Sequence, residues 1–397
     1  MTEREQRDRI SQLPNDILMS IISRLSLRDA TATCILSTSW RHLPSHLTRL
    51  NFPPYNSFRG SLKKYTRMID QVLNSHRGDR IKEFRLDARR CGGEFESWFE
   101  FAVSKKAEII HISVCPRELY HRLPNANGLE CLKELYLSNI HMTDQDFGYL
   151  VSTCVALERF TLYYVGWRNV SIVGLPKLKH LNLSHLWRTK TVVIRDLISL
   201  VSLRCCEWTG KWWLGECSEQ LSNLPKLTKL ELRNHSYPLG HIEFLAGMPS
   251  CMRDQLQLLF LSCRTLTKLN HDLSFQLANL KHLEIMFCMR TDCERGDWRH
   301  VIRLVKACRS LQKLVIKFGE VNGETVDHTL HYNPQKCLEI SGYLGYYAEH
   351  GLILDLINNI NITSLQKVNF VAPREAALGR ARFDFEHIKS VDFLVIS

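Results

Sequence analysis

The sequence lacks the marks of several large classes of protein. No segment approaches about 18 uninterrupted apolar residues, the length that a membrane-spanning helix needs. The opening residues, Met1 to Arg9, are charged and contain no apolar stretch of the kind found in secretory signals. We therefore expect the protein in the nucleus, the cytoplasm or both, with no membrane partner.

The sequence also lacks cysteines at metal-binding or redox spacing, because none of the 14 cysteines forms a C-x-x-C motif. This argues against structural zinc and against thioredoxin-like redox chemistry, so we expect no metal and no cofactor. Cys154, Cys263 and Cys308 stand where an apolar residue is expected. We predict that these three are small buried packing residues.

Enzymatic motifs are missing as well. The sequence contains no nucleophile elbow, no phosphate-binding loop, no dinucleotide fingerprint and no zinc-protease helix. We therefore expect no catalytic residue. Trp208, Trp212 and Trp213 could line a small-molecule pocket or pack in a loop beside a strand, and the second interpretation is preferred.

The net charge of +11 raises the question of nucleic acid. Basic residues are spread over the whole chain, and no DNA- or RNA-binding signature is present, so no nucleic-acid partner is expected. Direct nucleic-acid binding stays open only as an alternative that would collapse with salt. The charge can instead favour acidic partners through steering.

Apolar residues recur at helical spacing between Ile10 and Leu50. The first stripe consists of Ile17, Leu18, Ile21, Ile22 and Leu25. Leu13-Pro14 marks the start of this helix, and Ser26-Leu27-Arg28-Asp29 has the form of a capping box that begins a second one. A third helix is expected to carry Trp40, Leu43 and Leu47. Three short helices cannot bury three apolar stripes against each other, so a partner surface is expected.

The residues from Asp8 to Leu18, with Ile21 to Leu25 and Leu36 to Leu43, resemble the F-box of the large plant F-box family. The resemblance implies docking on a Skp adaptor. It assigns contacts to Leu13, Pro14, Ile17, Leu18 and Ile21, and a forming or supporting role to Ile35, Leu36 and Trp40. Three positions depart from the family pattern, namely Asn15, Ser26-Leu27 and Pro44.

Beyond residue 80, the pattern apolar-x-x-apolar-x-apolar repeats, and it is the strand signature of leucine-rich repeats. Clear instances begin at Leu132, Leu157, Leu178, Leu227, Leu280 and Leu311, and weaker ones at Ile81, Ala107, Leu200, Gln335, Leu365 and Ile388. Successive starts from Ile81 to Leu227 are 21 to 27 residues apart, which is the leucine-rich range.

Helical stripes precede some of these strands. We predict them at Phe147, Leu150, Val151 and Cys154, at Leu256, Leu259, Phe260 and Cys263, and at Val301, Leu304, Val305 and Cys308. The pattern is irregular between Asn234 and Asn279, where starts at Leu266 and Leu280 are too close for two repeats, and Leu280 is favoured as the regular strand.

The predicted fold is α/β. A three-helix F-box over residues 7–50 is followed by a linker and capping helix over 51–79 and by about 12 degenerate leucine-rich repeats over 80–397, which form a solenoid with a curved parallel sheet and outer helices. Alternate strand residues on the inner face are candidates for recognition. They are Tyr136, Arg159, Tyr163, His180, Lys229, Arg233 and His282.

The resemblance implies a substrate-recognition subunit of an SCF ubiquitin ligase, without catalysis of its own. Such a subunit contacts the Skp adaptor, and through it a cullin, and promotes the ubiquitination and proteasomal degradation of a protein substrate that the sequence does not name. The alternative is a non-degradative scaffold or a small-molecule sensor built on the same repeats.

Overall fold

The structure is a computed structural model, and it describes residues 10–88, 95–114, 128–140, 142–165, 167–186, 189–206, 221–233, 240–263, 275–287, 299–319, 337–343, 347–359, 367–371, 375–385 and 394–396. These residues fall into two compact units, Met1–Leu178 and Lys179–Ser397. Each unit is built from parallel strands with helices on one side, and each is described by itself.

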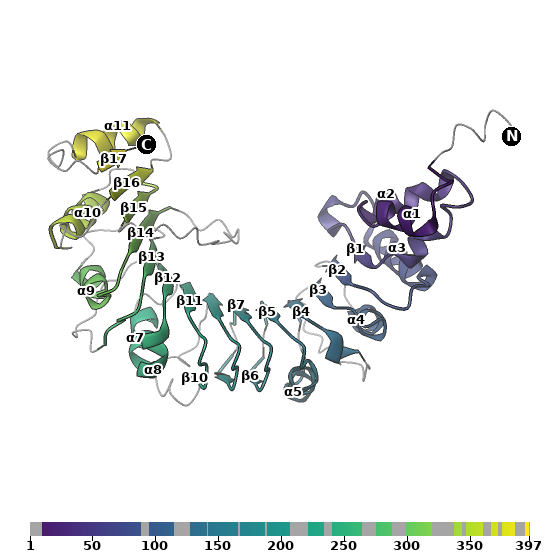
Figure 1. The fold of residues 1–397 in the computed structure, drawn as a ribbon, viewed down its shortest axis with the longest axis horizontal. Coiled ribbons are helices and arrows are strands. Elements are labelled where there is room, and N and C mark those ends of the chain that lie inside the picture. Colours follow the sequence, from purple (N-terminus) through teal and green to yellow (C-terminus); the bar gives the residue numbers. More distant parts are fainter. Residues whose placement is uncertain are drawn as a thin grey trace. The chain divides into compact units, whose positions relative to one another are not determined.

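The first unit begins with short helical elements and continues into strands. Its helices are α1 (Asn15–Ile22), α2 (Leu27–Ala32), α3 (Leu62–Ser75), α4 (Phe95–Ser104) and α5 (Asp144–Thr153), and its 3-10 turns are η1 (Thr33–Ile35), η2 (Leu43–His46), η3 (Tyr55–Ser57) and η4 (Leu129–Cys131). Its strands are β1 (Arg49–Asn51), β2 (Glu83–Ala88), β3 (Ile109–Val114), β4 (Glu134–Ser138), β5 (Arg159–Tyr163) and β6 (Asn169–Val173). Helices α4 and α5 lie on one side of the strands (Figure 1).

The sheet of the first unit starts inside the N-terminal helical segment. Strand β1 pairs in parallel with β2, Arg49 opposite Glu83, and β2 to β5 follow in chain order. Two further backbone bonds join the segments, since Arg77 N donates to Ser45 O at 2.8 Å and Lys82 N donates to Thr48 O at 2.7 Å. The helical module and the first strands are therefore hydrogen-bonded to each other.

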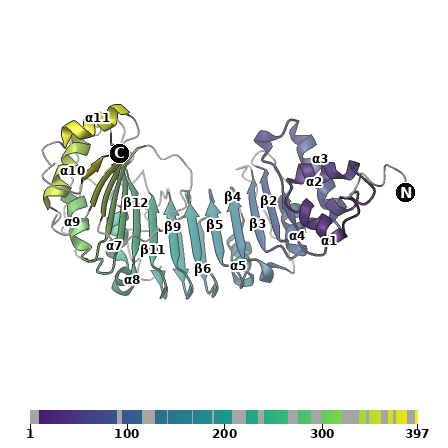
Figure 2. The ribbon, with the colours of Figure 1, turned by 45° about the horizontal axis from the view of Figure 1, so that its top comes forward.

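The second unit continues the same strand pattern. Its strands are β7 (His180–Ser184), β8 (Thr191–Arg195), β9 (Ser202–Cys206), β10 (Leu221–Ser222), β11 (Lys229–Arg233), β12 (Leu258–Cys263), β13 (His282–Phe287), β14 (Lys313–Phe318), β15 (Cys337–Ser341), β16 (Lys367–Val371) and β17 (Leu394–Ile396). Its helices are α7 (Gly240–Gly247), α8 (Ser250–Gln255), α9 (Arg299–Ala307), α10 (Tyr347–Asn359) and α11 (Glu375–Asp384). Figure 2 shows these strands side by side with the helices on one side.

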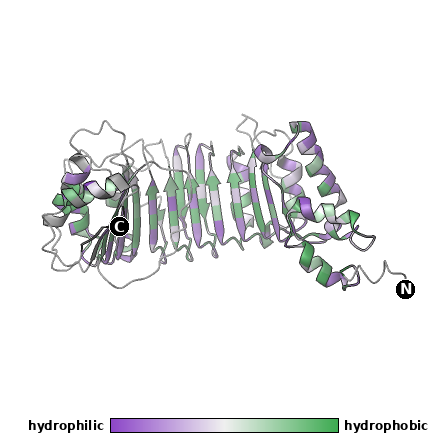
Figure 3. Cartoon of the chain, turned by 90° about the horizontal axis from the view of Figure 1, so that it is seen from above, coloured by the Kyte–Doolittle hydropathy of each residue, from purple (hydrophilic) through white to green (hydrophobic). Residues whose placement is uncertain are grey.

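Strand pairing in the second unit follows the order β7-β9-β11-β12-β13-β14-β15-β16-β17, all parallel. Strands β8 and β10 pair with each other in parallel in a separate sheet, Leu221 opposite Ile194. Hydrophobic and hydrophilic residues alternate along the strands, as the green and purple bands in Figure 3 show, and successive strand residues point to opposite faces of the sheet. The apolar members, such as Leu181, Leu203 and Leu230, are buried and form the core.

The leucine spacing located most of these strands. Starts predicted at Leu132, Leu157, Leu178, Leu227, Leu280 and Leu311 correspond to β4, β5, β7, β11, β13 and β14. The stripes at Phe147 and Val301 correspond to helices α5 and α9. The other candidate start, at Leu266, and the tryptophans Trp208, Trp212 and Trp213 lie outside the described residues.

One predicted helix is wrong. The stripe from Leu256 to Cys263 forms strand β12, paired with β11 and β13. Leu258, Phe260 and Leu261 are all buried, so the run is apolar on both faces, and a short run of this kind fits a buried strand as well as a helix. Leu256-x-x-Leu259-x-Leu261 is itself a repeat start, which restores regular spacing before Leu280.

The third helix predicted for the N-terminal module is also wrong. In its place the chain forms η2, a single 3-10 turn of four residues, and then turns into β1. Pro44 lies in this turn and has no N–H to extend a helical ladder. Leu43 and Leu47 are still buried, so they pack as expected in a different local structure.

Residues with left-handed backbone angles follow the strands at regular intervals. Asn139 (φ 58°) comes after β4, His185 (φ 56°) after β7 and Gly342 (φ 75°) after β15. The first two donate across to the next repeat, Asn139 N to Tyr163 O at 2.9 Å and His185 N to Cys206 O at 2.8 Å. These residues form the corner where each strand leaves the sheet.

Gly342→Ala is expected to lower stability. A Cβ at this position would lie 1.8 Å from Phe318 O, and its φ of +75° is strained for any L side chain. We expect a loss of about 2–4 kcal/mol, seen as a lower midpoint of thermal unfolding. Gly351→Ala, in helix α10 with nothing within 4 Å of the added Cβ, is the control and should raise the midpoint slightly. Equal midpoints for the two variants would contradict the assignment.

Candidate protein-docking surfaces

The N-terminal module exposes a concentrated set of large apolar side chains, which we call the apolar patch. It consists of Ile10, Leu13, Ile17, Ile21, Leu25, Ile35 and Leu36. Ile35 is 87% and Leu36 62% exposed, although both belong to a folded turn. Seven of the twelve exposed large hydrophobic side chains among the described residues therefore lie within 27 residues of one another in sequence.

Local sequence explains why the patch forms. Helix α1 begins directly after Pro14, which is exposed at its N-cap position, as predicted. Helix α2 begins at the predicted capping box, where Ser26 Oγ accepts from Asp29 N at 3.2 Å and donates to Asp29 Oδ2 at 2.7 Å. Two short helices then have more apolar surface than they can cover.

The buried side of α1 corrects one expected contact. Leu18 is 0% exposed and, like Ile22, is buried on the inner side of α1, so it serves as a core residue. Its neighbour Ile17 is exposed and keeps the contact role. Because successive helical residues point about 100° apart, the sequence stripe was too wide to separate the two.

Trp40 is 4% exposed and supports the patch from below. Its Nε1 donates to Ser11 Oγ at 2.9 Å, and Ser11 Oγ is also hydrogen-bonded to Ser37 Oγ at 2.9 Å. This network holds the segment that carries Ile10 and Leu13 beside the one that carries Ile35 and Leu36. Ile10 and Leu25 were not predicted as site residues, although the same helical spacing could have indicated them.

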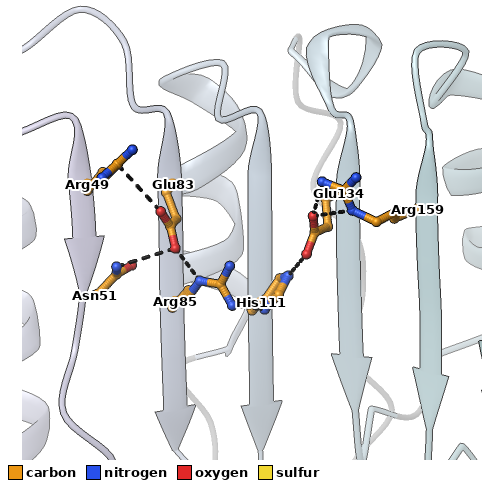
Figure 4. Close-up of polar contacts among 7 residues, drawn as sticks. All are labelled: Arg49, Asn51, Glu83, Arg85, His111, Glu134 and Arg159. Atoms are coloured by element: carbon orange, nitrogen blue, oxygen red, sulfur yellow. Dashed lines mark hydrogen bonds and ion pairs between the residues drawn. The ribbon is translucent and has the colours of Figure 1, made fainter. Parts of the chain in front are cut away.

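The strand face that carries no helices, here the open face, is polar in the first unit. Figure 4 shows a chain of charges across its strands. Glu83 on β2 lies 3.6 Å from Arg49 on β1, accepts from Asn51 Nδ2 at 3.3 Å and pairs with Arg85. Each of these contacts joins residues on the same or neighbouring strands.

His111 on β3 continues this chain. Arg85 Nη1 lies 2.6 Å from His111 Nδ1, and His111 Nε2 lies 2.6 Å from Glu134 Oε1. Arginine only donates, so Nδ1 must accept and Nε2 must carry the proton that is donated to Glu134. Tyr136 contacts the imidazole, with 5.5 Å between ring centroids.

Glu134 is the anion at the centre of this arrangement. It also accepts from Arg159 Nε at 2.6 Å. The hydrogen bond from His111 has the largest effect on the pKa of Glu134, burial opposes it, and the hydrogen bond from Arg159 adds to the lowering, so that the pKa falls from 4.5 to about 2. The carboxylate is therefore fully ionised at neutral pH and fixes both neighbouring side chains.

Three of the predicted recognition residues lie in the first unit, and the structure brings two of them together. Tyr136 and Arg159 lie on the open face around Glu134, and Tyr163, at the end of β5, contacts Tyr164 with ring centroids 4.7 Å apart. Arg85 and His111 were missed because their repeats begin at the weaker starts Ile81 and Ala107. Their place between buried Phe84, Ile110 and Ile112 would have indicated the open face.

The second unit carries the other four predicted residues on its own open face. His180 is exposed at the start of β7, Lys229 is half-buried at the start of β11, and His282 is half-buried at the start of β13. Arg233 differs from these three. It pairs with Glu231 and lies over the Phe260 ring at 4.7 Å from the centroid.

Two carboxylates on this face are buried, although their strand positions predicted exposure. Glu231 also binds Arg204 Nε at 2.5 Å, and Glu284 binds Lys317 Nζ at 2.7 Å. Buried charges need partners of this kind, because an unpaired one would lose its hydration without compensation.

Cysteine packing agrees with the sequence. Cys154 and Cys308 are buried, and burial raises the pKa of each thiol to about 12, which makes them inert packing residues. The side chain of Cys263 is outside the described set. Among the described residues, no group of His, Cys, Asp and Glu could hold a metal ion, and no helix is long and apolar enough to cross a membrane.

Comparison with known proteins identifies both parts. A model of the F-box domain matches residues 10–51, the segment that carries the apolar patch. A model of the At1g61320/AtMIF1 leucine-rich-repeat domain matches residues 121–339, more than half of the chain. The chain belongs to the plant F-box/leucine-rich-repeat family.

Curated relatives of this F-box/leucine-rich-repeat chain come from Arabidopsis thaliana. It is 26% identical to F-box/LRR-repeat protein At3g59200 over 211 residues, which make up 43% of this chain and 41% of that protein. F-box/FBD/LRR-repeat protein At5g56420 is 26% identical over 284 residues, 62% of this chain and 66% of that protein. F-box/LRR-repeat protein At3g58980 is 28% identical over 276 residues, 60% of this chain and 42% of that protein. The matches thus span from 41% to 66% of these relatives' lengths.

Leu18→Ala and Ile17→Ala should distinguish a residue of the buried core from a residue of the exposed apolar patch. Removing the fully buried Leu18 side chain is expected to lower the opening free energy of α1 by about 2–4 kcal/mol, because it leaves a cavity. Ile17→Ala, at an exposed neighbour, should cost less than about 1 kcal/mol. Hydrogen exchange of the α1 amides measures both. Equal effects would contradict the assignment of Leu18 to the core.

Glu134→Gln should remove a pH-dependent contribution to stability. The folded-state pKa is about 2 and the ordinary value is 4.5, so this contribution is present above about pH 4.5 and is lost as the pH falls towards 2. The glutamate side chain is only 17% exposed, and we expect about 1–3 kcal/mol near neutral pH.

Thermal midpoints measured from about pH 7 down to about pH 3 should converge for wild type and Glu134→Gln, because protonation removes the same charge in the wild type. Glu108→Gln, which removes an exposed ion pair with Lys133 at 2.9 Å, is the control and should change the midpoint little at any pH. A wild-type advantage over Glu134→Gln that does not change with pH would argue against the ion pairs described.

Proposed function

We propose that this chain is the substrate-recognition subunit of an SCF ubiquitin ligase. The observation that supports it most directly is the apolar patch, which lies within the residues that match the F-box domain. Monomeric soluble proteins seldom expose so many large apolar side chains in one short segment unless a partner covers them. The partner proposed is a Skp adaptor, and through it a cullin.

The proposed adaptor contact involves the exposed members of the predicted set. Leu13, Pro14, Ile17 and Ile21 lie on and before α1, and Ile35 and Leu36 extend the surface from η1. Leu18 and Trp40 hold this surface in place from the interior. The contact is proposed as a hydrophobic one, with affinity derived mainly from apolar area removed from water.

The open faces are proposed to hold a protein substrate. They combine charged, histidine and tyrosine side chains, a composition that fits protein recognition. Residues already held in ion pairs, such as Arg159 and Arg233, provide preorganised surface, and His180 is exposed at the start of β7.

The mechanism proposed requires no catalytic group in this chain. A substrate bound to an open face and an adaptor bound to the apolar patch are both held by one polypeptide, so lysines of the substrate are brought near the conjugating enzyme that the cullin recruits. Proximity raises the effective concentration of the reacting groups. Ubiquitination and proteasomal degradation of the substrate are the outcomes proposed.

The compartment proposed is the nucleus, the cytoplasm or both. Free thiols support this, since Cys34, Cys131, Cys154, Cys205 and Cys308 are all unpaired with another cysteine in the described structure. Reducing compartments keep thiols in this form.

Ile17→Asp combined with Leu36→Asp tests the adaptor contact. Each substitution places a carboxylate in the proposed hydrophobic interface, at a cost of about 1–2 kcal/mol or more, so the pair should reduce adaptor affinity by about 100-fold. The measurement is co-purification of the Skp adaptor and cullin with the full chain.

Val155→Asp combined with Ile198→Asp provides the matched control. These residues are 47% and 48% exposed and lie outside the residues that match the F-box. The control should keep both partners. Retention of the adaptor by the Ile17→Asp, Leu36→Asp variant would overturn the docking assignment, and adaptor binding without ubiquitination of any captured protein would favour a scaffold.

A further inference from the structure

Strand register in the second unit aligns the first open-face residue of each strand in one row. His180 pairs with Ser202, Ser202 with Lys229, Lys229 with Leu258, Leu258 with His282 and His282 with Lys313. No carboxylate stands in this row, which continues through Cys337 to Lys367. The edge where these strands begin is therefore basic.

Residues just before the strands extend this basic edge. Lys179 precedes β7, Lys226 lies in the turn before β11, and Lys281 precedes β13, and all three are exposed. We call Lys179, His180, Lys226, Lys229, Lys281, His282 and Lys313 the basic strip. In the six described residues before each of β7, β9, β11, β12, β13 and β14, the carboxylates are Asp196 and Asp254, so the strip keeps an excess of positive charge.

The carboxylates of this open face neutralise other cations. Glu231 binds Arg204 and Arg233, and Glu284 binds Lys317. These two stand in the next row, two residues further along their strands. Two strip residues are exceptions, since Lys313 Nζ binds Glu339 at 3.0 Å and His282 Nε2 lies 3.8 Å from Glu284 Oε2. Among the described residues, Lys226, Lys229 and Lys281 form no ion pair.

The spacing of the strip suggests the form of its ligand. Its lysines cluster at β7, β11 and β13, each two strands from the last in the order β7-β9-β11-β12-β13. Neighbouring strands lie about 4.8 Å apart, so the clusters repeat at about 10 Å. A peptide in the extended polyproline II conformation rises about 3.1 Å per residue with three residues per turn, so every third side chain lies on one face at a spacing of about 9 Å.

We propose that the basic strip binds an extended, aspartate- and glutamate-rich segment of a protein, with acidic side chains at every third residue. This rests on the proposed function only in taking that protein to be the ligase substrate. Lysine donates hydrogen bonds and accepts none, so carboxylates are suitable partners for several strip residues at once. The chain's net charge of +11 favours the encounter at a distance.

A fluorescein-labelled peptide of about ten residues, with glutamate at every third position, tests the proposal by fluorescence anisotropy with the full chain. Lys229→Glu combined with Lys281→Glu should weaken binding by at least about tenfold at low salt, because two attractive contacts become repulsive. Affinity for the wild type should fall as salt is raised. A peptide with glutamine in place of glutamate should not bind.

Lys63→Glu combined with Lys64→Glu is the matched control. Both lysines are exposed on α3 in the other unit, and the change in net charge is the same. This variant should bind the peptide within about twofold of wild type, since the local charges of the strip are intact. Equal weakening in both double variants would overturn the assignment, because it would show an effect of net charge alone.

Two further outcomes would also overturn the proposal. One is binding of the phosphoserine form of the peptide without binding of the glutamate form. The other is salt-sensitive binding of a DNA or RNA oligonucleotide that displaces the glutamate peptide. Adaptor capture measured on the same proteins separates this proposal from the previous one, because strip variants should still capture the adaptor. Loss of the peptide alone would therefore leave the proposed function standing.

Discussion

Parallel backbone pairing in fixed register is the constraint on which the rest of this structure depends. Leu135 stands opposite Phe160, and Leu230 opposite Leu259, so apolar side chains form continuous rows on one face. That face must be covered by helices or by the short strands β8 and β10, because a sheet with one apolar face is unstable in water. Period-two alternation then places the intervening residues on the other face, where they also align in rows. The same strand pairing therefore builds the buried core and aligns the residues of the open face.

The sequence predicted the strands well because the spacing of the leucines reflects the pairing of neighbouring strands in fixed register. It failed where one pattern fits two structures. The run from Leu258 to Leu261 satisfies both a helical stripe and a strand buried on two faces, and only pairing with β11 and β13 decides between them. Local chemistry decided a second case, since Pro44 shortened an expected helix to a 3-10 turn. The family resemblance identified the docking segment, but only packing showed that Leu18 points inward and Ile17 outward.

Charge pairing on the open faces was beyond prediction for a different reason. Arg204 and Glu231 are 27 residues apart in sequence, and Arg159 and Glu134 are 25 apart, so their contacts arise from register between repeats. Sequence alone can assign a residue to a face, but it cannot tell which cation a carboxylate will select. Ion pairs also divide the candidate recognition residues into two groups. A side chain fixed by an ion pair offers a preorganised contact, whereas a side chain without an ion pair can adjust its conformation to a ligand.

The backbone pairing of β1 with β2 restricts movement between the helical module and the first strands. Arg49 to Asn51 lie within the residues that match the F-box domain, yet they form the first strand of the parallel sheet in the first unit. If a flexible linker joined the helical module to the strands, a protein bound to the strands could take many positions relative to the module. Here backbone hydrogen bonds at Ser45, Thr48 and Arg49 fix the orientation of the first strands relative to the helices that carry the apolar patch. In the proposed ligase, the geometry of these first strands would then determine which substrate lysines come within reach.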